Sequence, residues 1–262
     1  MSRVSEKTIR DFGDQWKQHE ENSGYYASME LFKDIISPLL RIEDLKGARV
    51  AEIGSGTGRI VNILLESGVR HVFAVEPSES FNILRQNVSD PNKVTCLKIK
   101  GGDLQAYGDL DFVFCIGSIH HILDPKTVIT SAYNALRKGG RMVVWLYGYE
   151  GIEIYVNAIK IMRFVTTRIP DTVLRIIVRM MDVPLIAYMH LCARFKLPFA
   201  EYSKVLMKLE PRHRRLTIFD QLNPNYAKYY KHEEALNLLS GRFLDIKIKS
   251  RRNYSWTVVG TK

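Results

Sequence analysis

The sequence is poor in cysteine, with three in 262 residues, and it contains no CxxC spacing, internal repeat or low-complexity segment. The cysteines lie in apolar surroundings without a nearby histidine pair, so buried structural thiols are favoured and no metal site is predicted. The longest apolar stretch, residues 173–191, is interrupted by Arg175, Arg179, Asp182 and Pro184. Charges at that density are too costly in hydrocarbon for a membrane span. The N-terminus lacks a hydrophobic signal segment, so we expect a cytoplasmic location.

Positive charge is present in excess, but it is confined to one segment. The chain carries 38 Lys and Arg against 28 Asp and Glu, a formal net charge of +10. Residues 155–215 hold twelve of these cations against four acidic side chains, so the rest of the chain is close to neutral. Charge of this kind bears on solubility and on partners rather than on the fold.

Strand and helix patterns alternate through most of the chain. Two leading helices are expected at 6–16 and 27–42. Short apolar strands follow at 49–53, 72–75, 94–99, 111–116 and 141–147, separated by helices at 60–67, 78–88 and 125–136. A helix at 232–239 and strands at 243–249 and 255–260 close the chain. This rhythm predicts an α/β fold with a doubly wound, mostly parallel sheet. Residues 250–254 are too few for a parallel crossover, so the last strand should run antiparallel.

A glycine-rich turn, Glu52-Ile-Gly-Ser-Gly-Thr-Gly-Arg59, lies between the first strand and a helix. Glycines let the backbone turn sharply and approach a ligand at the helix N-terminus. A dinucleotide fingerprint would place its third glycine at position 59, which is Arg, and this disfavours a nicotinamide oxidoreductase. The segment resembles motif I of class I S-adenosylmethionine-dependent methyltransferases. That resemblance implies a Rossmann-like sheet of seven strands, an enzyme, and S-adenosyl-L-methionine as cofactor.

The resemblance also implies which residues bind the cofactor. The turn contributes an acidic residue and its glycines, and Glu76, at the end of the second strand, is expected to accept hydrogen bonds from the ribose hydroxyls. Asp103 and Leu104 are expected at the adenine, and Ile116 near the cofactor. The predicted cofactor-binding set is Glu52, Gly54, Ser55, Gly56, Gly58, Glu76, Pro77, Asp103, Leu104 and Ile116.

His120 and His121 follow the fourth strand, where the resembled family often has a similar histidine pair. A histidine pKa near neutrality suits removal of a proton from a hydroxyl, so both are candidate catalytic bases facing the methyl acceptor. A structural or helix-capping role is the alternative for either of them. No Asp/Asn-Pro-Pro-Tyr segment or Pro-Cys nucleophile is present, which disfavours the methyltransferase types that use them.

These observations predict a three-part organisation. Residues 1–45 form an N-terminal helical lid, 46–149 and 216–262 the cofactor-binding core, and 150–215 a basic helical insert over the acceptor. Plain hydrophobic docking is the alternative for the leading helix. The insert is either a cap with solvated charges, a surface that contacts an anionic membrane at its inner face, or a site for RNA.

The predicted reaction is methyl transfer from S-adenosylmethionine, with a hydroxyl of a small-molecule, sugar or lipid-linked compound as the acceptor. An RNA methyltransferase and a non-catalytic S-adenosylmethionine-binding module are the alternatives, and nucleic acid is the less favoured partner.

Overall fold

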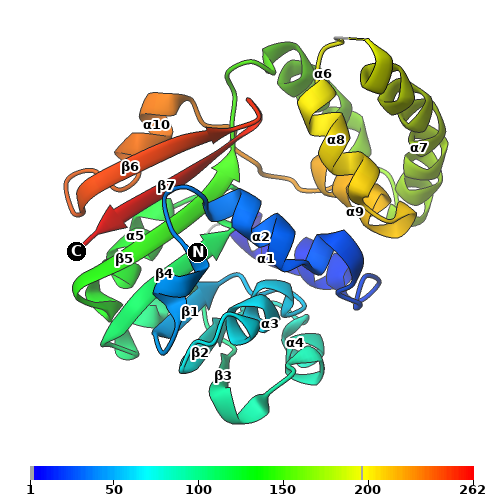
Figure 1. Cartoon of the computed structure of the whole chain (residues 1–262). Coiled ribbons are helices and arrows are strands. Elements are labelled where there is room, and N and C mark those ends of the chain that lie inside the picture. Colours follow the sequence, from blue (N-terminus) through cyan, green and yellow to red (C-terminus); the bar gives the residue numbers. More distant parts are fainter. Residues whose placement is uncertain (1–2, 196) are drawn as a thin grey trace.

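The chain forms one seven-stranded sheet with helices on both faces and a group of helices beyond one end of the strands (Figure 1). This computed structural model describes residues 3–195 and 197–262. The strand order is β3-β2-β1-β4-β5-β7-β6. The strands are β1 (Arg49–Ile53), β2 (His71–Val75), β3 (Val94–Leu97), β4 (Leu110–Ile116), β5 (Leu136–Tyr147), β6 (Leu244–Arg251) and β7 (Ser255–Thr261).

The directions of the strands confirm the predicted Rossmann-like sheet. Pairs β1–β2, β2–β3, β1–β4 and β4–β5 are parallel, whereas β7 is antiparallel to both β5 and β6. The short turn between β6 and β7 allows only a hairpin, as its length indicated. The order reverses at β1, because β2 lies on one side of it and β4 on the other. A sheet of this type binds ligands at such a reversal, beyond the carboxyl ends of its strands.

Two apolar layers hold helices against the sheet. One face is covered by α2 (Met29–Ile36), α3 (Arg59–Glu66) and α4 (Phe81–Asn87), whose side chains pack with those of β1, β2 and β4. The opposite face is covered by α5 (Pro125–Ala135) and α10 (His232–Asn237). Coverage of both faces explains why the central strands read as nearly continuous apolar runs.

Four helices between β5 and α10 form the group that we call the cap. They are α6 (Glu153–Thr166), α7 (Asp171–Arg194), α8 (Ala200–Lys208) and α9 (Pro211–Leu222). An apolar cluster joins α6, α7 and α9 through Ile159, Val178 and Phe219. The predicted boundary at residue 215 falls inside α9, so this helix belongs in space with the cap over its whole length.

The predicted helix at 27–42 is wrong in its extent. A 3-10 turn (Gly24–Ala27) precedes α2, which ends at Ile36. Pro38 is the physical reason, because a proline disfavours helical backbone in the residue before it and carries no N–H for the helix ladder. β5 starts at Leu136 rather than at residue 141: Leu136 pairs with Leu110, and the register shifts before Arg141 pairs with Phe112.

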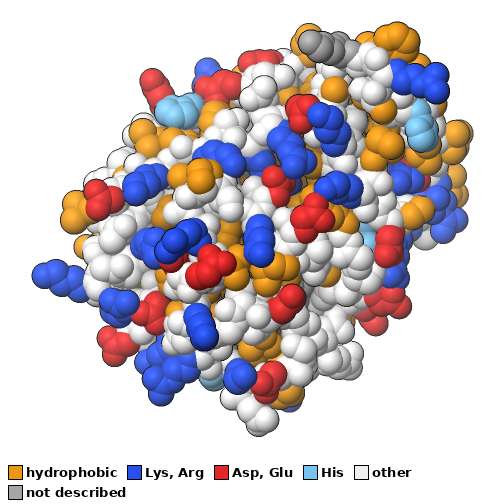
Figure 2. Space-filling view, in the orientation of Figure 1, with side chains coloured by type: hydrophobic (Ala, Val, Ile, Leu, Met, Phe, Trp, Pro, Cys, Tyr) orange, Lys and Arg blue, Asp and Glu red, His pale blue; other side chains and the backbone are white. Residues whose placement is uncertain are grey.

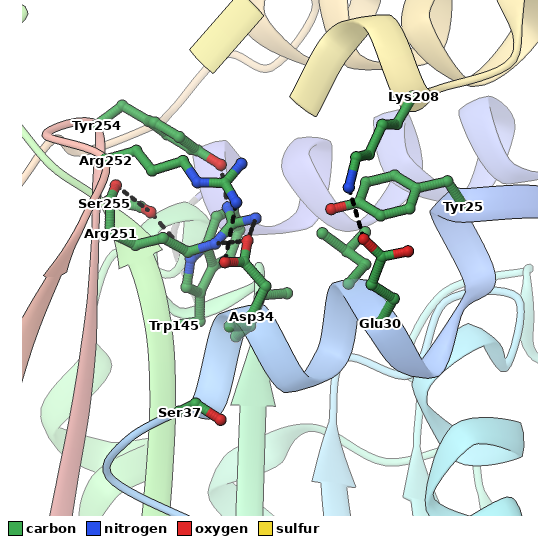
Figure 3. Close-up of polar contacts among 12 residues, drawn as sticks. Tyr25, Glu30, Asp34, Ser37, Trp145, Lys208, Arg251, Arg252, Tyr254 and Ser255 are labelled. Atoms are coloured by element: carbon green, nitrogen blue, oxygen red, sulfur yellow. Dashed lines mark hydrogen bonds and ion pairs between the residues drawn. The ribbon is translucent and has the colours of Figure 1, made fainter. Parts of the chain in front are cut away.

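Polar contacts fix α2 between the sheet and the cap (Figure 3). Asp34 of α2 accepts hydrogen bonds from Arg251, at 2.8 Å from its Nε, and from Arg252, at 3.0 Å. One turn earlier, Glu30 pairs with Lys208 of α8 at 2.6 Å. The helix is therefore tied to the β6–β7 hairpin on one side and to the cap on the other.

Within the cap, a buried carboxylate joins α7 to α9. Asp182 is 1% exposed and accepts hydrogen bonds from Arg214, at 2.6 Å and 3.2 Å, and from Arg215, at 3.0 Å. Burial alone raises the pKa of Asp182, but the hydrogen bonds from the two arginines outweigh it and hold that pKa below its usual value of 3.8. The pair is therefore charged on both sides at neutral pH.

Asp182→Asn should lower the free energy of unfolding by about 3 kcal/mol at pH 7, because it leaves the buried Arg214 without a counter-charge. The lowered pKa of Asp182 means that this contribution is present above pH 3.8 and is lost as the pH falls below that value. Urea unfolding measures both effects. Asp171→Asn is the control, since its 3.9 Å pair with Arg175 is partly exposed and should contribute under about 0.5 kcal/mol. Equal loss in the two variants would contradict this account.

Candidate cofactor and acceptor site

A cavity of about 1280 Å³ lies at the carboxyl ends of β1, β2, β4 and β5. Its floor comes from the ends of these strands, and its other walls come from α1 (Arg3–Trp16), α7, α8 and α9. Sites for drug-sized ligands measure about 300–1,000 Å³, so this cavity has room for two ligands side by side.

The glycine turn forms the polar end of the cavity. Gly54 and Gly56 line it with positive φ angles of 78° and 53°. A Cβ on Gly54 would lie 2.6 Å from the Cβ of Ser118, which no structure tolerates without a shift. Gly58 is the N-cap residue of α3, with its backbone in the left-handed region, and it does not line the cavity. Ser55 does line it, with its amide bonded to the carbonyl of Val75 at 3.0 Å.

Glu76 joins the glycine turn to the end of β2. Its Oε2 accepts from the Gly56 amide at 2.8 Å, and its Oε1 accepts from the Ser78 amide at 2.9 Å. Burial raises the pKa of Glu76 above its usual value, against these opposing hydrogen bonds. A carboxylate has about four acceptor positions, so this one keeps capacity for ribose hydroxyls on the side that lines the cavity.

Glu52 is the second buried carboxyl group at this end. It is 1% exposed, and its Oε2 has no hydrogen-bond partner within the described chain. Burial raises the pKa of Glu52 to about 8, although the nearby Arg59 acts in the opposite direction. An unpartnered carboxyl oxygen that lines a cavity is costly unless a ligand satisfies it, and a cationic group satisfies it best.

The remaining predicted cofactor residues divide into two groups. Pro77, Asp103 and Ile116 line the cavity, and Asp103 is exposed beside the turn at residues 101–102. Leu104 does not reach it. Its side chain is fully buried in the apolar layer under α5, and its predicted contact with adenine stays a prediction. The cavity wall at this point is formed instead by Gly101 and Val128.

The two histidines occupy different environments. His121 lines the cavity, and its Nδ1 donates to the Tyr226 carbonyl at 3.0 Å, because a carbonyl can only accept. The neutral ring therefore carries its lone pair on Nε2, which is buried without a partner among the described residues. Burial lowers the pKa of His121 below 6.5, against the charge of Asp220, so the ring is neutral at pH 7.

His120 is not part of the cavity wall. It is fully buried with its ring 3.8 Å from that of Tyr147, and neither ring nitrogen has a partner in the described chain. Burial lowers the pKa of His120 well below 6.5. The structure thus separates the two predicted bases, and of the two only His121 lines the cavity.

Sequence reasoning did not place Asp220 in the site. Asp220 accepts hydrogen bonds from the Tyr147 hydroxyl at 2.7 Å and from Gln15 at 3.2 Å. Asp220 and Tyr147 line the cavity, whereas Gln15 does not. The available signal was the stretch 219–224 with its following tyrosines, whose mixture of acid, amide and aromatic side chains is typical of a polar ligand wall. The contact between Asp220 and Tyr147 could not be predicted, because 73 residues separate them in the sequence.

The leading helix α1 closes the cavity from the side opposite the strands. Phe12 packs at 4.6 Å against the His121 ring, and Trp16 lies over the glycine turn, 3.4 Å from where a Gly56 Cβ would be. The segment after α1 continues this contact, because Asn22 and Thr57 exchange two hydrogen bonds of 2.9 Å and 2.8 Å.

The residues present fit an adenosyl amino acid. The glycine turn leaves space that a side chain would fill, Glu52 offers an unsatisfied carboxyl oxygen, and Glu76 holds the next strand end. Among residues 3–195 and 197–262, no group of three His, Cys, Asp or Glu side chains could hold a metal ion. Fold and site together agree with the predicted class I S-adenosylmethionine-dependent methyltransferase.

Comparison with known proteins agrees with this class. Residues 51–144 match the family described as "Methyltransferase domain", a segment that contains the glycine turn and both histidines. The chain therefore carries a methyltransferase domain, which agrees with the predicted family and with the predicted S-adenosylmethionine cofactor.

The curated relatives are named tRNA U34 carboxymethyltransferase. The protein from Alteromonas mediterranea is 28% identical over 131 residues, which are 47% of this chain and 39% of that protein. The protein from Sulfurimonas denitrificans is 29% identical over 136 residues, or 50% of this chain and 45% of that one. The chain thus spans less than half of the length of the curated relatives it matches.

Solved methyltransferases share the fold at low identity. Magnesium protoporphyrin IX methyltransferase from Synechocystis PCC 6803, solved with bound S-adenosylhomocysteine, gives a TM-score of 0.54 at 13% identity, covering 98% of this chain and 99% of that one. Human N-acetylserotonin methyltransferase, solved with S-adenosylmethionine, gives 0.57 at 10% identity over 100% of this chain and 59% of that one.

The raised pKa of Glu52 leads to a pH-dependent affinity for S-adenosylhomocysteine, whose α-amino group is cationic below about pH 8. A cation beside Glu52 favours its ionised form, so binding must release the proton that Glu52 holds below its pKa of about 8. We expect affinity to rise up to about tenfold per pH unit from pH 6 toward pH 8. Titration calorimetry measures this rise.

Glu52→Gln should bind more weakly and lose the pH dependence, whereas the exposed Glu66→Gln should keep both at their original values. A Glu52→Gln protein with an unchanged pH profile would show that this carboxyl group does not meet the ligand cation.

Proposed function

We propose that this protein transfers the methyl group of S-adenosylmethionine to a hydroxyl of a small acceptor with a largely apolar body. The observation that carries the proposal is His121, which lines a cavity shared by the glycine turn and the cap and whose buried Nε2 has no partner among the described residues. A neutral imidazole with an unpartnered nitrogen beside a ligand cavity is suited to general-base catalysis.

The walls of the cavity support an acceptor of this kind. The cap side is lined by aliphatic and aromatic side chains, among them Leu185, Leu206 and Leu216. Among the polar groups of the wall, Asp220, Gln221 and His121 can orient a hydroxyl. A site that is mostly apolar with a small number of placed polar groups is typical of small-molecule recognition.

When bound, S-adenosylmethionine supplies a methyl carbon activated by its sulfonium. In the proposed step, the acceptor oxygen forms a bond to that carbon while the carbon–sulfur bond breaks and S-adenosylhomocysteine leaves. The hydroxyl proton moves to Nε2 of His121. The resulting imidazolium is stabilised by the Tyr226 carbonyl and by the nearby Asp220. Phe12 and Trp16 exclude water from this step, which strengthens electrostatic interactions inside the site.

In this scheme the predicted organisation is kept with one change. We propose that residues 46–149 and the chain after α9 bind the cofactor, that the first 45 residues act as a lid, and that α6 to α9 bind the acceptor. His120 is proposed to position its neighbours by packing under Tyr147 rather than to take a proton.

Methylation of RNA is the second candidate function, and the name of the curated relatives, tRNA U34 carboxymethyltransferase, favours it. The two candidates separate in one experiment. Purified protein is incubated with tritium-labelled S-adenosylmethionine and either a small-molecule and lipid extract or a total tRNA fraction. Label in the organic extract supports the first candidate, and label in tRNA alone overturns it.

His121→Ala should lower kcat for the labelled acceptor by about 10²–10⁴-fold while the affinity for S-adenosylhomocysteine stays within about twofold. Because the pKa of His121 lies below 6.5, the wild-type rate at saturating S-adenosylmethionine should be constant above pH 7 and should fall as lower pH protonates the base. Pre-steady-state rates of methyl transfer, recorded for both proteins across pH, measure the loss of rate and its pH dependence.

His120→Ala is the matched comparison. It removes packing under Tyr147, so its loss should appear in thermal stability and should not remove the pH dependence of turnover. Full turnover in His121→Ala would exclude His121 as the base. It would not contradict cofactor binding by the domain.

A further inference from the structure

The outer surface of the cap is apolar where a soluble protein usually places polar side chains. Helix α7 packs its inner face against α8 and α9 with Leu174, Val178 and Met189. Its opposite face is apolar as well, with Met180 70% exposed and Val183 69% exposed. The exposed large side chains of α6, α7 and the residue after α7 are Ile154, Ile161, Phe164, Val165, Val173, Ile176, Met180, Val183, Leu191 and Phe195.

This concentration is local. Among the described residues, the only exposed large hydrophobic side chains outside the cap are Val4, Leu123 and Leu244. Along α7 the exposed set recurs at helical spacing, so it forms a stripe about 27 Å long from Val173 to Leu191. A contiguous apolar surface of this kind marks an interaction site rather than ordinary surface variation.

Unpaired cations border the stripe. Lys160, Arg168, Arg179 and Arg194 lie on α6, on α7 and in the turn between them, and none of them forms an ion pair within the part of the chain that the structure describes. In Figure 1 α7 is the outer wall of the cap on the right, and Figure 2 shows hydrophobic and Lys or Arg side chains together along that edge. Acidic side chains are scarce there, since Asp182 is turned inward and Asp171 pairs with Arg175.

We propose that the outer surface of α6 and α7 binds peripherally to an anionic lipid bilayer. Aliphatic side chains at helical spacing with Lys and Arg at their border fit the boundary between acyl chains and negatively charged headgroups. A second copy of the chain would bring like charges together across the interface, which disfavours self-association. RNA would be matched by the cations but not by a stripe of Ile, Val and Met, because phosphate contacts dominate RNA affinity.

The helix lies on the membrane and does not cross it. By length and composition alone α7 is apolar enough to span a bilayer. Its inner face, however, carries Asp182 in contact with Arg214 and Arg215, and it is packed on α8 and α9. A spanning helix would have to break these contacts, whereas a helix in the plane of the interface keeps them. The proposal goes beyond methyl transfer and does not depend on it.

Vesicle sedimentation of the full-length protein tests the proposal without any substrate. We expect binding to vesicles of equal parts phosphatidylcholine and phosphatidylglycerol, and at least tenfold weaker binding to phosphatidylcholine alone. The combined variant Ile176→Ser, Met180→Ser, Val183→Ser should lower the partition coefficient at least tenfold. Leu244→Ser, which removes a side chain of 69% exposure on β6, is the matched control and should bind as the wild type does.

Each other result counts against the proposal. Absence of binding to the anionic vesicles overturns it, and so does equal binding by the triple variant, because the contact would then lie elsewhere. A dimer in sedimentation equilibrium that the triple variant dissociates would assign the stripe to self-association instead. Unchanged affinity for S-adenosylhomocysteine, measured by calorimetry in each variant, shows that the variants are folded and keeps this test separate from the test of methyl transfer.

Discussion

The carboxylate of Glu76 is the contact on which the arrangement of the site depends. By accepting from the amides of Gly56 and Ser78, it fixes the glycine turn against the end of the neighbouring parallel strand. The position of the turn then determines where α3 begins and where the unsatisfied oxygen of Glu52 points. A buried carboxyl group with a raised pKa is unfavourable for folding at neutral pH, so stability is given up here for a preformed ligand site.

Polar and apolar groups divide the cavity into two ends. Groups that can satisfy a charged ligand come from the strand ends of the sheet, where backbone direction alone gathers them. The cap contributes mostly aliphatic and aromatic walls and is joined to the sheet through the segments that precede α6 and follow α9. The polar end of the cavity thus rests on the sheet, and the apolar end rests on helices that have their own apolar cluster and ion pairs.

Local patterns were sufficient for the sheet, because buried parallel strands read as apolar runs and glycine spacing marks the turn. They were not sufficient for contacts made across the fold. The separate environments of His120 and His121 depend on a carbonyl 105 residues away, at Tyr226. The burial of the Leu104 side chain could not be predicted either, because the sequence shows that a residue is apolar but not whether it faces a ligand or the layer under a helix.

Helix α1 touches both ends of the cavity at once. Trp16 covers the glycine turn, while Gln15 donates to Asp220 in another part of the cavity wall. Any displacement of this helix therefore loosens both parts of the wall at once. If the cavity holds a nucleoside and a methyl acceptor as proposed, exchange of the spent nucleoside and release of the methylated compound both require this one movement.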